Sequence, residues 1–186
     1  MTGHDLRLIG PRLLLWRSWN TDGLHLGEVR SQVAPYVWHP GVNQAQHLNS
    51  GLLTASPEYD VSGICRCSHC GFYGFFTPIV NVTNLWGAIL VWGRVSLHRT
   101  GARGQYAQIV GFWRYDDPVR TLVYGPRLEV IQLLAATFEV PYYSDGIKES
   151  QASMEYFRLS MSDSGVYTPR TGEEALSQLS SWSSGA

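Results

Sequence analysis

Three cysteines stand close together at Cys65, Cys67 and Cys70, and their spacing is the feature of this sequence best suited to chemistry. Cys67 and Cys70 form a C-x-x-C pair, whose tight turn lets two thiolates bind one tetrahedral Zn²⁺. Gly71 follows directly and can adopt a positive φ, which turns backbone N–H groups toward the sulfurs. If residues 64–67 are extended, Cys65 and Cys67 point to the same face. The sequence therefore predicts a structural zinc knuckle on which all three thiols converge.

A complete structural zinc site needs four ligands, and the chain has no second C-x-x-C pair. His98, at the end of an expected strand, and His47, on an earlier loop, are both placed to fold back as the fourth ligand. His69 lies inside the knuckle and is expected to point away. The alternative is that the cysteines are ordinary thiols beside a turn, because a free cysteine is often simply buried. An iron–sulfur cluster usually takes four cysteines, and this chain has three.

The sequence contains none of the common catalytic motifs. It lacks a phosphate loop, a dinucleotide-binding glycine motif, a nucleophile elbow and the H-E-x-x-H metalloprotease motif. No Cys–His–Asp arrangement can be placed on it either. We therefore expect a non-enzymatic binding or interaction module, stabilised by zinc and directed at a protein partner. The alternative is a small enzyme that uses metal-activated water or the thiols.

Composition indicates where the chain is expected to be located and which classes of partner it is expected to bind. Lys and Arg number 14 against 15 Asp and Glu, a net charge of -1, so nothing global attracts nucleic acid or an anionic membrane. Hydrophobic residues make up 44% and charged residues 16% of the 186 residues, enough for a substantial core. No apolar run approaches the ~20 residues that span a bilayer. With no signal peptide pattern and no disulfide framework, the expected location is cytoplasmic.

The segments before and around the cysteines alternate between strands and loops. Residues 13–19 are mostly apolar and aromatic and predict a strand, and residues 24–29 predict a short second one. Residues 34–60 are rich in Pro, Gly, Asn and Ser, which is typical of a loop. Residues 61–67 and 72–77 would flank the cysteine turn as two arms.

The clearest secondary structure signal lies over residues 87–115. Ile89 and Val91 point one way and Leu90 and Trp92 the other, which is the period of a strand. Residues 105–115 alternate in the same way, and a segment with two glycines separates the two runs. The pattern predicts one antiparallel hairpin with its turn at residues 100–104.

Helices are expected toward the end of the chain. Residues 127–138 carry an apolar stripe at helical spacing, which predicts a helix covering a sheet face. A weaker helix is expected over 149–159. Residues 142–145 read as a loop. Residues 171–174 have the form of a capping box and begin a short amphipathic helix, which would dock on its own domain or on a partner.

Together these elements predict an α+β fold with one globular, β-rich domain over residues 1–160 and a Ser/Gly-rich tail over 161–186. The core would be a curved antiparallel sheet or small barrel, covered by one or two helices. The cysteine knuckle would lie at one edge of that sheet.

One motif extends over the predicted hairpin: Gly87-x-Ile89-x-Val91-Trp92-Gly93-x-Val95-x-x-His98-x-x-Gly101-x-Arg103-x-x-Tyr106-Ala107. With this motif, residues 65–107 resemble a family of actinobacterial and actinophage proteins for which no activity is established. The motif is similar to G-x-V-x-L-W-G-x-V-x-E-H-x-x-G-Y-R-A-E-Y-A, which in the family follows C-x-C-G-I-Y-A. Cys70-Gly71-Phe72-Tyr73-Gly74 matches the second half of that earlier motif. The chain departs from the pattern at Leu97 and Ala102, and its cysteine spacing is one residue longer.

The resemblance implies that the cysteines, His98 and Arg103 belong to one recurring constellation. It places His98 ahead of His47 as the fourth zinc ligand. It also implies a role for Arg103, whose guanidinium beside a glycine turn could bind a carboxylate or phosphate. The alternative for Arg103 is a solvated side chain at the tip of a hairpin.

Overall fold

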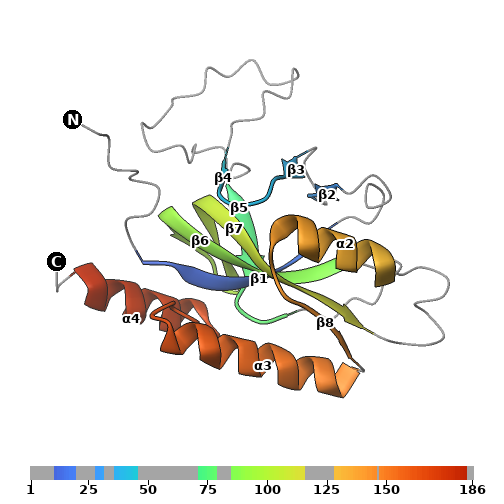
Figure 1. The fold of residues 1–186 in the computed structure, drawn as a ribbon. Helices are drawn as coiled ribbons and strands as arrows, with labels where there is room; N and C mark the ends of the chain where they lie inside the picture. Colours follow the sequence, from blue (N-terminus) through green and yellow to red (C-terminus); the bar gives the residue numbers. More distant parts are fainter. Residues whose placement is uncertain are drawn as a thin grey trace, which may run out of the picture.

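The computed structural model has an α+β fold in which helices pack around a curved, mainly antiparallel sheet, as the sequence predicts (Figure 1). The structure describes residues 11–19, 28–31, 36–45, 71–78, 85–115, 128–145 and 147–183. Within these ranges no helix combines the length and the apolar character that crossing a membrane requires. The elements, in chain order, are β1 (Leu13–Trp19), β2 (Val29–Arg30), β3 (Val37–Trp38), β4 (Asn43–Gln44), β5 (Phe72–Phe75), β6 (Leu85–Leu97), β7 (Gly101–Tyr115), α2 (Leu128–Phe138), β8 (Tyr142–Asp145), α3 (Ile147–Asp163) and α4 (Gly172–Ser183).

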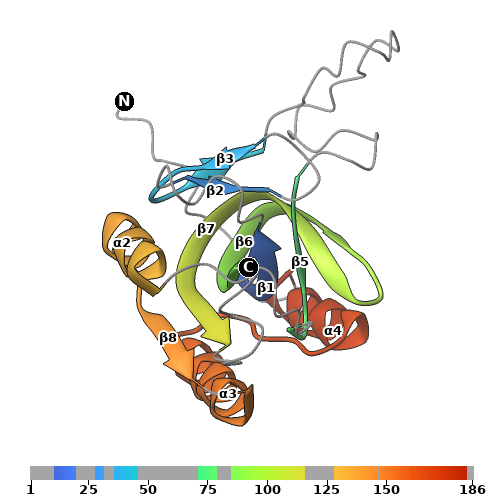
Figure 2. The ribbon, with the colours of Figure 1, turned by 90° about the vertical axis from the view of Figure 1, so that its right-hand side faces the viewer.

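The strand pairings form a closed cycle, β1–β5–β7–β6 and back to β1, with every pair antiparallel. Figure 2 shows these strands curving round into a ring. The link between β1 and β5 is short and consists of the pair Trp16 and Phe75. β4 pairs with β7 in the antiparallel direction. β8 pairs with the last residues of β7 in the parallel direction. β2 and β3 form a separate two-stranded sheet.

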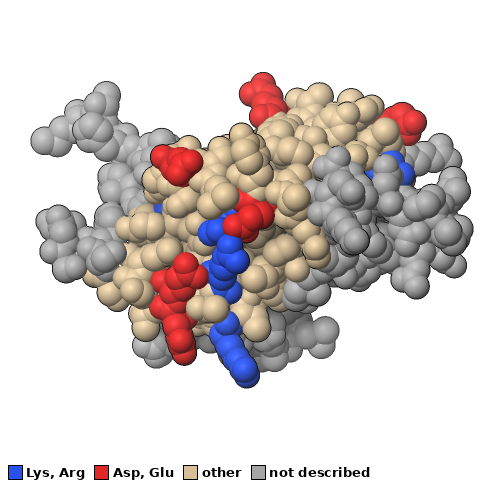
Figure 3. Space-filling view, turned by 90° about the horizontal axis from the view of Figure 1, so that it is seen from below, with Lys and Arg blue, Asp and Glu red and all other residues tan. Residues whose placement is uncertain are grey.

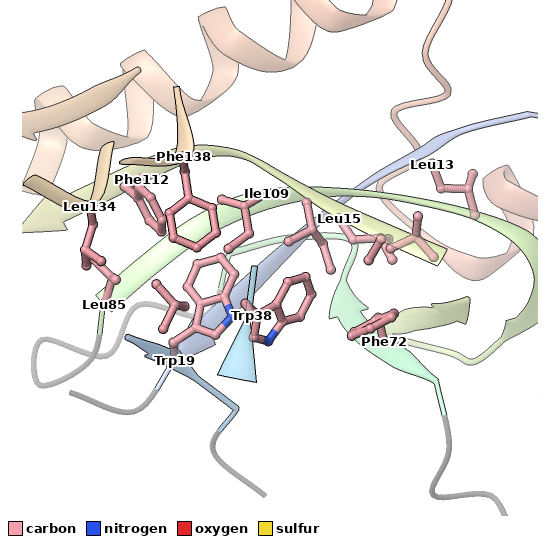
Figure 4. Close-up of a cluster of buried hydrophobic side chains, with 14 of the residues drawn as sticks. Leu13, Leu15, Trp19, Trp38, Phe72, Leu85, Ile109, Phe112, Leu134 and Phe138 are labelled. Atoms are coloured by element: carbon pink, nitrogen blue, oxygen red, sulfur yellow. The ribbon is translucent and has the colours of Figure 1, made fainter. Parts of the chain in front are cut away.

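Both faces of the sheet are buried over Leu85–Trp92 of β6, because the alternating side chains there are apolar on each side. Ile89 and Val91 of β6 belong to an interior cluster that α2 closes, and Figure 4 shows its aromatic residues packed together. Leu90 and Trp92, their neighbours in the chain, belong to an outer cluster that α3 covers with Met154 and Phe157. The alternation predicted for this strand is therefore confirmed.

The hairpin of β6 and β7 is confirmed, but its predicted turn at 100–104 is wrong. The turn lies at residues 98–100, and Gly101 and Gly104 both lie inside β7. A Cβ on Gly101 would stand 2.1 Å from the carbonyl oxygen of Gly74 in β5. Glycine is present here because neighbouring strands approach closely. In the sequence alone, such a glycine cannot be distinguished from a glycine in a turn.

The helix predicted over 127–138 is confirmed from Leu128, and its stripe is buried. The helix expected over 149–159 is α3, which is longer at both ends. Residues 142–145 form strand β8 and not a loop, because they pair with the end of β7.

Helix α4 docks on its own domain. The N–H of Glu174 donates to the hydroxyl of Thr171 at 3.1 Å, which is half of the predicted capping box. Ala175 is fully buried in the interior cluster, and Leu179 packs against that cluster.

An ionic cluster joins α3 to the segment that precedes α4. Arg158 and Arg170 approach the same oxygen of Glu155, at 2.5 and 2.6 Å. Figure 3 shows basic and acidic side chains in contact on the face that α3 and α4 form. The hydrogen bond from Arg158, with smaller contributions from both positive charges, holds the pKa of Glu155 below its ordinary value of 4.5.

Replacing Glu155 with glutamine is expected to remove a pH-dependent part of the stability. A carboxylate whose pKa is lowered by folding stabilises above its ordinary pKa, and this contribution is lost as the pH falls below 4.5. Because the side chain is 43% exposed, we expect about 1 kcal/mol or less at pH 7. Urea unfolding of wild type and E155Q at pH 7 and pH 3 measures the difference, which should shrink at pH 3. The exposed residue Glu139 provides the control, E139Q; a difference that stays constant with pH contradicts the prediction.

Candidate functional site

The predicted zinc ligands Cys65, Cys67 and Cys70 lie outside the described residues, as do His47 and His69. The described chain resumes at Gly71, whose φ of 108° is positive, as predicted for the residue after the knuckle. Across the ranges that the structure describes, no group of at least three His, Cys, Asp or Glu side chains is arranged to hold a metal. The zinc knuckle therefore stays a prediction.

Strand β5 is where the other predicted site residues meet. Tyr73 pairs directly with Arg103 of β7, and Arg103 pairs on its other side with Ser96 of β6. The ring of His98 contacts the ring of Tyr73 edge-on, with 5.7 Å between centroids. Three adjacent strands thus bring His98 and Arg103 to the strand that directly follows the cysteines, although neither is near Tyr73 in the sequence.

Arg103 is not a solvated side chain at a hairpin tip, because it lies within β7 and is only 8% exposed. Its Cγ lies 2.5 Å from the position that a Cβ on Gly71 would occupy. The stem of Arg103 therefore covers the residue that follows Cys70, and a side chain at position 71 would displace it. The Nε atom of Arg103 is buried and has no hydrogen-bond partner.

His98 lies beside the last residue of β5. Its N–H donates to the carbonyl of Gly101 at 2.8 Å, and Gly101 pairs with Phe75, the last residue of β5. The residue is exposed. Ligation by His98 stays a prediction.

Arg17 of β1 also reaches this part of β5, and the sequence reasoning missed it. Its guanidinium donates to the backbone carbonyl of Tyr73 and, at 3.0 Å, to the hydroxyl of Ser31. The guanidinium carbon lies 5.3 Å from the centroid of the Trp38 ring, at cation–π distance. Burial lowers the pKa of Arg17 to about 10, so the group stays charged at neutral pH. No sequence signal marked this position, because residues of both parities in β1 are apolar and buried.

The two arginines place positive charge at residues 71–73, where the surrounding strands carry no acid. Residues 71–78 and 85–115 contain neither Asp nor Glu. Among the described residues, the ion pairs join Glu28 to Arg30 and Glu155 to Arg158 and Arg170, and none includes Arg17 or Arg103. Burying a charge without a partner is costly. The geometry therefore suits a negatively charged group beside the first residues of β5.

Two described acids, Glu173 and Glu174, stand at the start of α4. A Cβ on Gly172 would stand 2.7 Å from the carbonyl oxygen of His98, so this helix begins at the β6–β7 turn. The carboxylate of Glu174 accepts a hydrogen bond from the backbone N–H of Arg170 at 2.7 Å. Both Glu173 and Glu174 are exposed, and they follow Gly172, which lies against the backbone of His98.

The side chains around Tyr73 offer donors for binding. The hydroxyls of Tyr73 and Thr100 lie 3.4 Å apart, within hydrogen-bond distance. A guanidinium, an imidazole and two hydroxyls can bind an anionic or polar group. In the described parts of β5, β6 and β7 there is no carboxylate to act as an acid or base beside them.

Comparison with known proteins adds no relative to this description. The chain matches no protein-family model, no curated protein and no solved structure.

Proposed function

We propose that this protein is a non-enzymatic binding module whose binding face, around Tyr73 and Arg103, is held in shape by a zinc knuckle. Cys65, Cys67 and Cys70 are the thiolate ligands in this proposal, and His98 is the fourth. The observation that carries it is the contact of the Arg103 stem with Gly71, the residue after Cys70. A positive charge beside a cysteine favours the thiolate, which is the form that binds metal.

The donors around Tyr73 support binding more than catalysis. The described strands of the site supply a guanidinium and hydroxyl groups but no carboxylate, and the one imidazole, that of His98, is a zinc ligand in this proposal, so no acid and base pair is left for proton transfer. An enzyme would instead need an open metal position that holds water. The number of protein ligands on the metal therefore distinguishes the two functions: four support a structural knuckle, and three with one water support metal-assisted chemistry.

We expect the purified protein to contain one zinc per chain, because the knuckle is a tetrahedral thiolate site. Cys67→Ser and Cys70→Ser should each lose the metal together with the cooperative unfolding transition, since a structural zinc contributes directly to folding. Elemental analysis and circular dichroism measure the two effects. Ser68→Ala, within the same turn, is the matched control and should keep both. A metal-free wild type that unfolds cooperatively contradicts the proposal.

The ligand set is tested by X-ray absorption on the zinc-loaded protein. Three sulfurs at about 2.3 Å and one nitrogen at about 2.0–2.1 Å are expected. His98→Gln should remove the nitrogen, whereas His47→Gln should leave it. If the two variants give the reverse result, His47 is the ligand. A water oxygen in the fourth position of the wild type would favour the enzyme over the binding module.

A further inference from the structure

Two buried guanidinium groups reach residues 71–73 from opposite faces of β5. Arg17 comes from the interior face, since it shares the parity of Leu15 and Trp19 in the interior cluster. Arg103 comes from the outer face, because its neighbour Ala102 belongs to the interior cluster. Each of the two arginines has a buried Nε atom without a hydrogen-bond partner.

Arg103 is the arginine whose guanidinium N–H donors have no acceptor among the described residues. It is 8% exposed, and in the described parts of the chain no oxygen accepts a hydrogen bond from its guanidinium. A planar guanidinium presents paired N–H donors that match the two oxygens of a carboxylate or phosphate. The stem is fixed between its strand neighbours and Gly71, so the donors are held in place before a ligand arrives.

Arg17 supplies a second positive charge that is fixed in position. Its hydrogen bonds to Tyr73 and Ser31 and its position over Trp38 hold the guanidinium on the other side of the strand. Inside a protein the attraction between charges is several times stronger than in water. An anion bound by Arg103 is therefore also attracted by Arg17, without direct contact.

From these observations we propose that the face around Arg103 binds an oxyanion, a phosphate or carboxylate group of the ligand, with Arg103 as the residue that contacts it. The inference rests on the proposed binding function and gives the chemistry of what is bound. Arg17 acts as a positioning and charge-supplying residue. The absence of Asp and Glu from residues 71–78 and 85–115 leaves these strands without a competing internal anion.

Titration of the zinc-loaded, full-length protein with inorganic phosphate, and separately with acetate, tests the inference. The readouts are the arginine Nε–H signals in ¹H–¹⁵N NMR spectra and the dissociation constant, each compared with sodium chloride at equal ionic strength. We expect the Arg103 signal to shift and saturate. Arg103→Lys keeps the charge but loses the paired donors, so it should weaken binding about tenfold or more.

Arg99→Lys is the matched control, because Arg99 lies exposed at the β6–β7 turn. It should leave the dissociation constant unchanged. Binding of phosphate alone assigns the site to phosphate groups, and binding of acetate alone assigns it to carboxylates. The inference is overturned if neither anion shifts the Arg103 signal, or if R99K and R103K weaken binding equally. It is also overturned if only removal of zinc by a chelator shifts that signal, since the thiolates would then be the partner of Arg103.

The zinc content of the same samples separates this inference from the proposed function. A protein that contains zinc but binds neither phosphate nor acetate contradicts the oxyanion site and does not contradict the zinc-stabilised binding module. A folded, zinc-free protein that binds phosphate through Arg103 contradicts the knuckle and supports the oxyanion site. If R103K fails to fold, Arg103→Met replaces it, because methionine keeps most of the buried stem.

Discussion

Replacing Trp113 with alanine is expected to lower the free energy of unfolding by about 3–5 kcal/mol. Trp113 is fully buried on the outer face of β7. Its ring stacks on Tyr143 of β8 with 4.7 Å between centroids, and Phe157 of α3 packs edge-on against it at 5.1 Å. Its indole N–H donates to the hydroxyl of Ser153 at 3.1 Å. The substitution removes contacts that join the sheet to β8 and α3, and it leaves a cavity that these elements cannot fill without moving.

Urea unfolding followed by circular dichroism measures this effect. Tyr156→Ala is the control, because Tyr156 is an aromatic residue of α3 that is 74% exposed. A surface substitution of that kind usually changes stability by about 0.5 kcal/mol or less. Trp113→Phe should fall between the two, since it keeps most of the ring contacts but loses the hydrogen bond to Ser153. Equal losses for W113A and Y156A would show that α3 does not pack on the sheet in this way.

Replacing Gly101 with alanine is expected to destabilise the protein by about 3 kcal/mol or more, at the upper end of overpacking effects. The added Cβ would stand 2.1 Å from the carbonyl oxygen of Gly74, a backbone atom that cannot rotate away. Relief of the clash requires β5 and β7 to separate, and that pairing places Arg103 opposite Tyr73. The variant should therefore also lose phosphate binding, even where part of the population stays folded.

Gly41→Ala is the comparison for this variant. Gly41 has a positive φ of 78° and open space around the position of a Cβ. Alanine there bears only the cost of the left-handed conformation, about 1–2 kcal/mol. A larger loss in G101A than in G41A, with phosphate binding lost only in G101A, is the expected result. If G41A is the more damaging variant, close strand approach at Gly101 is not a constraint on the fold.

The parts of the fold that the sequence predicted are those with long apolar patterns. Strand β1, the β6–β7 hairpin and helix α2 each contain enough alternating or helically spaced apolar residues to define their type. β8 has four residues and pairs with the far end of β7, so its structure comes from that partner and not from a pattern of its own.

The β6–β7 turn was predicted at the wrong residues because of a tertiary contact that the sequence does not show. A glycine in a turn and a glycine under a neighbouring strand look the same in a single sequence. Gly101 belongs to the second kind, because the carbonyl of Gly74 occupies the space where its side chain would stand. β5 and β7 pair although they are far apart in the sequence, and no local sequence pattern predicts that pairing.

The candidate site was predictable only in part. His98 was predicted from its position at the end of an expected strand and Arg103 from a resemblance, and the structure brings both to β5. The burial of Arg103 and its contact with Gly71 depend on the register of three strands, which the sequence does not determine. Arg17 was missed because residues of both parities in β1 are apolar, so the sequence does not show which side chains of this strand point into the interior cluster.

The contact between β1 and the segment before α4 bears on how fast this protein folds. Leu14 donates its N–H to the carbonyl of Tyr167, and Tyr167 donates to the carbonyl of Arg12, both at 2.8 Å. β1 also pairs with β6 along its whole length. Contacts between residues so far apart in sequence raise the contact order, since long loops must close before the contacts form. Such a topology is typical of domains that fold in about milliseconds to seconds. During folding, the backbone N–H of Leu14 gains its native acceptor only when the segment that contains Tyr167 has docked on β1.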